Sequence, residues 1–130
     1  LKKLPGDLES RVAVRKRYLE NLSKVDRVEI PFADCDEFTS NYIFPIVIMD
    51  STKDQRNALR EYIHAQGIQT SVHYPAAHHF TTYKELGAVL PQTDYCTDNE
   101  VTLPMYAALT MEQVDFICEV VANGIKEIYG

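Results

Sequence analysis

A nearly continuous apolar run, YIFPIVIM at residues 42–49, constrains the fold more than any other stretch of this 130-residue chain. β-Branched and aromatic residues dominate the run and Asp50 follows it, a pattern typical of a buried strand. Pro45 has no backbone N–H to give to a ladder, so it favours an edge strand or a bulge. The run therefore predicts a buried strand.

A capped helix and a second strand are expected next. Ser51 or Thr52 can cap a helix that ends before Gly67, and glycine suits the position after the last turn, where a positive φ is needed. Residues 68–73 then alternate apolar and polar side chains, which predicts a strand. The strand–helix–strand order favours a parallel pair.

Two amphipathic helices are predicted near the ends of the chain. The first covers 7–24, and its apolar residues recur at helical spacing: Leu8, Val12, Leu19 and Leu22. The last begins at a capping box formed by Thr110 and Gln113. Its apolar stripe is typical of a core-facing helix rather than of a cofactor site: Met111, Val114, Ile117, Cys118, Val121, Ile125 and Ile128.

Shorter elements complete the order. A short strand ending at Pro31 is predicted within 26–32, another strand at 100–104, one or two helical turns at 80–87, and a loop at 89–99. The α-β-α-β-β-α order predicts the α+β class, with helices packed on a small mixed sheet in one domain over residues 1–130.

Composition narrows the function classes. A net charge of −6 argues against nucleic acid as a partner, because phosphate binding needs a basic surface. No apolar run approaches the roughly 20 residues of a membrane span, so no membrane is expected. The three cysteines form no CxxC pair, which favours a reducing, cytoplasmic setting. One basic group on helix 7–24 is interpreted as a solvated face: Arg11, Arg15, Lys16 and Arg17.

Three of the four histidines lie within seven residues, at His73, His78 and His79. They suggest a metal site, but adjacent side chains do not converge easily, no HxH or HExxH pairing is present, and no obvious carboxylate lies nearby in the sequence. No metal is therefore expected. Nucleophilic catalysis would need a cysteine beside these histidines; Cys118 lies on the last apolar stripe, and nothing specifies Cys96.

A third interpretation places polar ligand-binding groups at the end of a strand. His73 and Tyr74 would end strand 68–73, and Pro75 would fix the turn after it. Both side chains can hydrogen-bond phosphate or sugar oxygens. A satisfied surface histidine beside a packed tyrosine is equally consistent with the spacing.

Several stretches occur in an order that points to one enzyme family. LKKLPGDLESRVAVRKRYLENL comes first and NYIFPIVI follows. Gly67-Ile68-x-Thr70-x-x-His73-Tyr74-Pro75 precedes His78 and Tyr83, and LP at 90–91 precedes VTLPMYAALTMEQV. This set, which covers nearly the whole chain, resembles the C-terminal small domain of the DegT/DnrJ/EryC1/StrS aminotransferases. These are fold-type-I pyridoxal-phosphate enzymes that act mostly on sugars carried by nucleotides.

The resemblance implies a domain, a function and a site. Residues 1–130 would be the small domain, with helix 7–24 leading out of a missing large domain that binds pyridoxal phosphate. The parent, a homodimer, would transfer an amino group from glutamate to a nucleotide-linked keto sugar in amino-sugar biosynthesis. His73, Tyr74 and His78 would border its substrate pocket. His79 leaves the identity of the second pocket histidine open by one residue.

The chain itself lacks what this cofactor requires. Pyridoxal-phosphate catalysis needs a Schiff-base lysine, an acidic partner for the pyridine nitrogen and a phosphate cradle. All seven lysines are expected at solvated positions and there is no glycine-rich loop, so we expect no catalytic or cofactor-binding residue here and an inactive fragment. The alternatives are a stand-alone α+β ligand-binding or regulatory module, and a degenerate family member that serves as an interaction protein. A free-standing module would not expose Leu8, Val12 or Tyr18 on its first helix without a partner.

Overall fold

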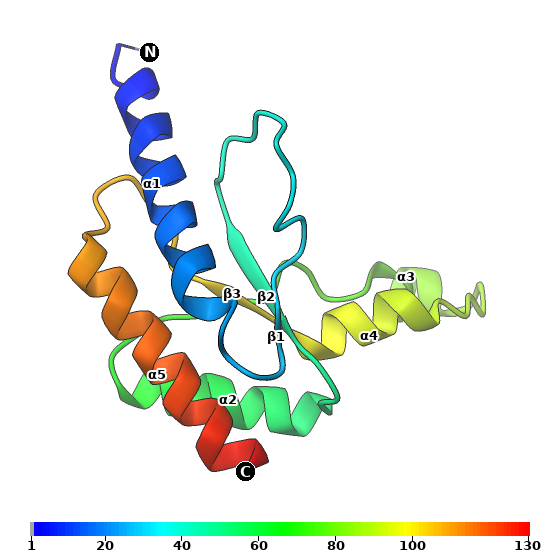
Figure 1. The fold of residues 1–130 in the computed structure, drawn as a ribbon. Coiled ribbons are helices and arrows are strands. Elements are labelled where there is room, and N and C mark those ends of the chain that lie inside the picture. The colour runs from blue at the N-terminus through cyan, green and yellow to red at the C-terminus, as the bar shows by residue number, and fades with distance from the viewer. Residues whose placement is uncertain (1) are drawn as a thin grey trace.

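The computed structural model describes residues 2–130 and confirms the α+β class. Three long helices, α1 (Leu4–Leu22), α2 (Lys53–Ala65) and α5 (Met111–Tyr129), pack with a sheet of β1 (Val28–Glu29), β2 (Phe44–Ile48) and β3 (Glu100–Leu103). A 3-10 turn, η1 (Ala77–His79), and two short helices, α3 (Thr81–Lys84) and α4 (Pro91–Asn99), lie on the side away from α1 and α5 (Figure 1).

The sheet has the order β1-β2-β3, and both pairs are antiparallel. The strand predicted at 42–49 is confirmed as β2, the central strand, whose residues are mostly buried. β1 pairs only with Val47 and Ile48 of β2, so Pro45 has a paired neighbour on the β3 side alone. The proline is tolerated in a central strand because β1 is too short to reach it.

The strand predicted at 68–73, and its parallel pairing, are wrong. This segment makes one antiparallel bridge, between Ser71 and Thr102 of β3. The backbone groups of Thr70 are taken by side chains of α2: its N–H donates to His64 Nε2 at 3.1 Å, and its carbonyl accepts from Arg60 Nη2 at 3.1 Å. These groups are therefore satisfied outside a strand ladder.

Two shorter predictions are also corrected. The loop predicted at 89–99 is α4, because Pro91 occupies the first turn of a helix, where its missing N–H costs nothing. The strand predicted within 26–32 is reduced to the two residues of β1. The helical turn predicted at 80–87 is confirmed as α3, with Gly87 after it at φ 59°.

The caps predicted for α2 and α5 are confirmed, whereas α1 covers Leu4–Leu22 rather than the predicted 7–24. Thr52 and Thr110 each accept a hydrogen bond from the backbone N–H three residues later, and the side-chain oxygens of Gln55 and Gln113 accept one from the backbone N–H of the cap residue. Gly67 follows α2 with φ 79°, and its N–H donates to the carbonyl of His64.

Helix α1 buries only part of the predicted stripe. Val14, Tyr18 and Leu22 are fully buried, whereas Val12 is 53% exposed. The Tyr18 ring stacks on Phe44 with 4.5 Å between centroids, and its hydroxyl donates to the Pro104 carbonyl at 2.9 Å. Only the second half of α1 is therefore fixed by the core, and Val12 lies on the surface without a partner.

The basic group on α1 is more than a solvated face. Arg11 donates to the carbonyls of Asn41 and Met105, both at 3.2 Å. Arg17 makes two 2.7 Å hydrogen bonds to the carboxylate of Asp115 on α5. These guanidinium groups join α1 to the segments beside it. Within residues 2–130, no helix has both the length and the apolar character that crossing a membrane requires.

Candidate functional site

His73 lines an open cleft of about 450 Å³ beside β3. The segment before it runs along the free edge of β3, because Ser71 and Thr102 exchange backbone hydrogen bonds of 3.2 and 2.9 Å. Residues 69–71 form one wall with His73, and the opposite walls come from Tyr42, Ile43 and residues 102–105. The cleft is thus built from three segments that are distant in the sequence.

A buried polar network holds His73 in place. The carboxylate of Glu100, which is 6% exposed, accepts from the His73 backbone N–H at 3.0 Å and from the Thr102 hydroxyl. Thr102 Oγ1 also lies 2.9 Å from His73 Nδ1, and Ser71 Oγ lies 3.2 Å from it. Backbone and ring of the histidine are therefore fixed by one carboxylate and two hydroxyl groups.

The network determines the tautomer of His73. An ionised carboxylate only accepts, so the single hydroxyl proton of Thr102 is committed to Glu100. Thr102 Oγ1 must then accept from His73, which places a proton on Nδ1. In the neutral ring Nε2 carries a lone pair, and it makes no hydrogen bond to any residue of 2–130. A ligand meeting neutral His73 would be bound through a group that donates a hydrogen bond.

Arg56 of α2 supports this network by binding the backbone at Glu100. It is 3% exposed, and it donates to the backbone carbonyls of Glu100 at 2.6 Å and Thr97 at 3.1 Å. Burial lowers the pKa of the guanidinium, and the neighbouring Arg60 adds to this effect, whereas the charge of Glu100 opposes it. The charge of Glu100 therefore offsets only part of the cost of burying Arg56.

The structure brings two of the three predicted site residues together. Tyr74 is 67% exposed, and its ring meets that of His73 edge-on, with 4.8 Å between centroids. Its carbonyl accepts from Thr97 Oγ1 at 3.3 Å, which ties the segment to α4. His78 does not line the His73 cleft; its side chain is 9% exposed and lies against Asp94 of α4.

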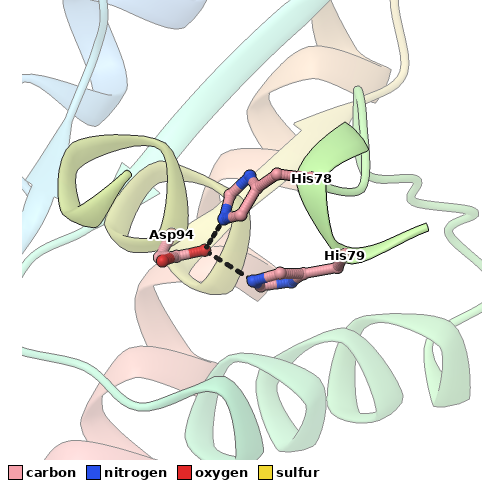
Figure 2. A group of neighbouring side chains, drawn as sticks. All are labelled: His78, His79 and Asp94. Atoms are coloured by element: carbon pink, nitrogen blue, oxygen red, sulfur yellow. Dashed lines mark ion pairs between the residues drawn. The ribbon is translucent and has the colours of Figure 1, made fainter. Parts of the chain in front are cut away.

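His78 and His79 converge, contrary to the expectation for adjacent side chains. They lie on η1, and Nε2 of each ring is 2.9 Å from Asp94 Oδ1 (Figure 2). The 3-10 turn brings the ring centroids within 4.2 Å of each other. The sequence argument missed Asp94 because it lies fifteen positions after His79, on a helix that was predicted as a loop.

A family model described as the DegT/DnrJ/EryC1/StrS aminotransferase family matches residues 1–122. The chain belongs to this family. A curated relative, the 3-oxo-glucose-6-phosphate:glutamate aminotransferase of Bacillus subtilis, is 26% identical over 128 residues, which are 92% of this chain and 28% of the relative.

Solved structures of sugar aminotransferases share the fold. Helicobacter pylori PseC, an aminotransferase involved in pseudoaminic acid biosynthesis, matches with a TM-score of 0.90 at 23% identity, covering 98% of this chain and 35% of PseC. Spr1654 of Streptococcus pneumoniae in its PLP form matches with a TM-score of 0.88 at 24% identity, covering 98% of this chain and 33% of that protein. This DegT/DnrJ/EryC1/StrS chain therefore spans about a third of the length of these relatives.

The residues of this family member do not fit a pyridoxal-phosphate site. All of its lysines are exposed: Lys2, Lys3, Lys16, Lys24, Lys53, Lys84 and Lys126. None has the enclosed setting in which a lysine is desolvated and activated as a Schiff-base nucleophile. The buried Cys118 offers no substitute nucleophile, since burial raises the pKa of its thiol to about 11.

Sequence reasoning missed the residues that orient His73. Glu100 and Thr102 are two positions apart on β3, so their side chains share a face of a strand that is otherwise apolar. Two polar groups on one face of a buried strand were a usable signal, because buried polar groups are hydrogen-bonded to something. Their partner, His73, could not be deduced from the sequence, because it depends on the bridge between Thr102 of β3 and Ser71.

Proposed function

We propose that this chain is the C-terminal small domain of a pyridoxal-phosphate-dependent aminotransferase that moves an amino group from glutamate to a nucleotide-linked keto sugar. The carrying observation is that the family model matches almost the whole chain, while the chain spans only 28–35% of the relatives it matches. The remaining two-thirds would supply the large domain. Amino-sugar biosynthesis in the cytoplasm is the setting that this function suits.

The cofactor would be held by that large domain. The match to a PLP-form structure supports pyridoxal phosphate as the cofactor of the parent. The lysines of this chain are too exposed to serve as the Schiff-base lysine that would hold this cofactor. Residues 1–130 would then contribute no group that reacts, and their part would be to bind and orient the substrate.

His73 and Tyr74 would do this at the border of the substrate pocket. Neutral His73 presents an acceptor at Nε2, which suits a sugar hydroxyl, and the exposed Tyr74 ring offers a flat surface and a phenolic hydroxyl beside it. A reactant held by fixed groups loses its orientational freedom when it binds, so this entropy loss no longer adds to the barrier of the chemical step. His78, with its side chain enclosed, would border the pocket by shaping the loop after Tyr74.

Exposed apolar side chains support docking onto a large domain and a second subunit. Val12 is 53% exposed on α1, against the expectation for a free-standing module. Two segments, the loop 32–42 and the stretch 80–89 that includes α3, carry further exposed aromatic and aliphatic groups: Phe32, Phe38, Tyr42, Phe80, Tyr83, Leu86 and Val89. Surfaces of this kind mark protein interfaces, so we propose that the large domain covers α1 and that one or both segments face the partner subunit.

The test uses the native protein from its source. We expect an intact mass well above 14.8 kDa. With pyridoxal phosphate and glutamate, we expect this protein to form 2-oxoglutarate beyond one equivalent per bound cofactor only when a keto sugar is added, and faster with a nucleotide-linked ketose than with a ketose phosphate. A native species of 14.8 kDa would refute the domain assignment in favour of a stand-alone module. Equal or better turnover of the sugar phosphate would refute the nucleotide link alone.

The role of His73 is tested in the same protein. His73→Phe keeps a ring of similar bulk but removes the acceptor, so we expect KM for the sugar to rise about ten-fold or more while the half-reaction with glutamate alone is unchanged. The exposed Asn123 of α5 provides the control position, because Asn123→Phe introduces the same ring outside the His73 cleft. An unchanged KM in His73→Phe would remove His73 from the site.

A further inference from the structure

We propose that His78, His79 and Asp94 form a binding site for one divalent transition-metal ion, with Zn²⁺ as its best probe. Nothing in the proposed aminotransferase function requires this site. Its three ligand atoms, Nε2 of each histidine and a carboxylate oxygen of Asp94, all lie within 4.8 Å of one another. Two imidazoles and one carboxylate are a donor set that zinc and its first-row neighbours use in proteins.

The polar atoms of the cluster have no hydrogen-bond partner that would explain their position. His78 Nδ1, His78 Nε2 and Asp94 Oδ1 are all buried, and none makes a hydrogen bond within residues 2–130. The 2.9 Å contacts at Asp94 are short enough for an ion pair, but the ring N–H directions do not point at the oxygen. Because unpartnered polar atoms are costly to bury, the two that face each other, His78 Nε2 and Asp94 Oδ1, indicate an absent positive partner.

The enclosure of His78 supports the same conclusion. Its side chain is 9% exposed and faces into the cluster, while those of Asp94 and His79 are 36% and 54% exposed (Figure 2). The site is therefore closed behind His78 and open toward solvent on the His79 side. A metal ion could enter from that side and keep water in its remaining coordination positions.

The distances suit a metal after a small adjustment. Ligand atoms at about 2.0–2.1 Å from a metal are separated by roughly 2.9 Å when they subtend a right angle and by about 3.3 Å in a tetrahedron. Each histidine nitrogen lies 2.9 Å from Asp94 Oδ1, which matches the right-angle arrangement. Moving the partly exposed Asp94 carboxylate about 0.4 Å away from both rings would bring both of these distances to the tetrahedral value.

The ligands come from two elements that little else holds together. His78 and His79 lie on η1, and Asp94 lies in the first turns of α4, after an exposed segment that includes α3. A bound ion would close residues 78–94 into a loop and fix the chain that follows Tyr74. The site would thus be structural, with the ion stabilising the arm formed by η1, α3 and α4.

The test is metal binding by the 130-residue chain, prepared without a histidine tag and stripped of metal. We expect one equivalent of Zn²⁺ to bind and to raise the melting temperature, and Co²⁺ to give visible d–d absorption of a nitrogen–oxygen site. His79→Gln and Asp94→Asn are each expected to weaken Zn²⁺ binding ten-fold or more. Because both side chains are partly exposed, these variants should fold, which circular dichroism without metal will verify.

Two matched controls separate this site from adventitious binding. His64→Gln changes the exposed histidine of α2, and Asp98→Asn changes a carboxylate one turn after Asp94 that pairs with Lys53. Both controls should keep the affinity of the unmodified chain. No stoichiometric Zn²⁺ binding, equal weakening in the controls, or full affinity in either His79→Gln or Asp94→Asn would each overturn the proposal.

Discussion

Replacing Glu100 with glutamine is expected to move the ring proton of His73 from Nδ1 to Nε2. A glutamine has one acceptor and one donor where the carboxylate has two acceptors. Its oxygen would take the His73 backbone N–H, and its amide would donate to Thr102 Oγ1. Thr102 is then free to donate its hydroxyl proton to His73 Nδ1, which becomes the acceptor. The group presented to the cleft would change from an acceptor to a donor.

The cost in stability follows from the same contacts. Glu100 accepts two hydrogen bonds as a charged group, each worth about 1.5–3 kcal/mol, against about 0.5–1.5 kcal/mol for a neutral acceptor. At a position that is only 6% exposed, burying a neutral amide costs less free energy than burying a carboxylate, which offsets part of the lost hydrogen-bond energy. We therefore expect the free energy of unfolding to fall by about 1–2 kcal/mol, and Tm to fall by roughly 3–8 °C.

The assay is two-bond ¹H–¹⁵N correlation NMR on histidine-labelled chain at about pH 8, where an ordinary histidine is neutral. It distinguishes the protonated ring nitrogen from the unprotonated one. Glu127→Gln, on the exposed side of α5, is the matched control and should leave His73 unchanged. A proton that stays on Nδ1 in Glu100→Gln would refute the assignment of donor and acceptor along the network.

Three further predictions concern packing, charge and cofactor. Gly124→Ala would place a methyl group 2.7 Å from Leu59 and 2.8 Å from Tyr62. We expect the overpacking, about 1–3 kcal/mol, to outweigh the gain in helix propensity, about 1 kcal/mol, so that Tm falls. A rise in Tm would contradict the close approach of α2 and α5. The hydrogen bonds from Arg17 hold the pKa of Asp115 below its usual value, so the pair stabilises the fold above about pH 4 and loses this effect as pH falls through the lowered pKa. In thermal unfolding from pH 6 down to about pH 2, Asp115→Asn should remove part of that acid sensitivity, and an unchanged pH profile would count against the pairing. Borohydride reduction of the chain with pyridoxal phosphate should leave scattered, sub-stoichiometric lysine adducts in a peptide map, because every lysine is exposed; one fully labelled lysine would contradict this.

The parts of the fold that sequence reasoning found are those fixed by local chemistry. Thr52 and Thr110 cap helices through groups only three residues away, and Gly67 ends a helix because its own φ must be positive. The apolar run 42–49 is a strand whatever it pairs with. Each of these signals depends on a few neighbouring residues, so the pattern alone carries it.

The parts that were missed depend on distant partners. Alternation at 68–73 predicted a strand, but Arg60 and His64, reaching from α2, satisfy the backbone of Thr70 instead. Val12 fits the helical stripe of α1, yet the core contacts only the Val14–Tyr18–Leu22 face. No local pattern contains this information, because it follows from how the helices are placed around the sheet.

In the candidate site, too, some features follow from neighbouring residues and others depend on partners that are distant in the sequence. His73 and Tyr74 were proposed from the family resemblance and from a strand end expected at residue 73, which the structure replaces with a single bridge at Ser71. Their orientation could not be predicted, since it depends on the bridge between Ser71 and Thr102 and on the buried Glu100 below it. This network lies wholly inside residues 2–130, so the chain can set the direction of the His73 ring without the remainder of the parent. If the proposed function holds, the large domain has to bring cofactor and ketone to a histidine whose donor and acceptor sides are already decided.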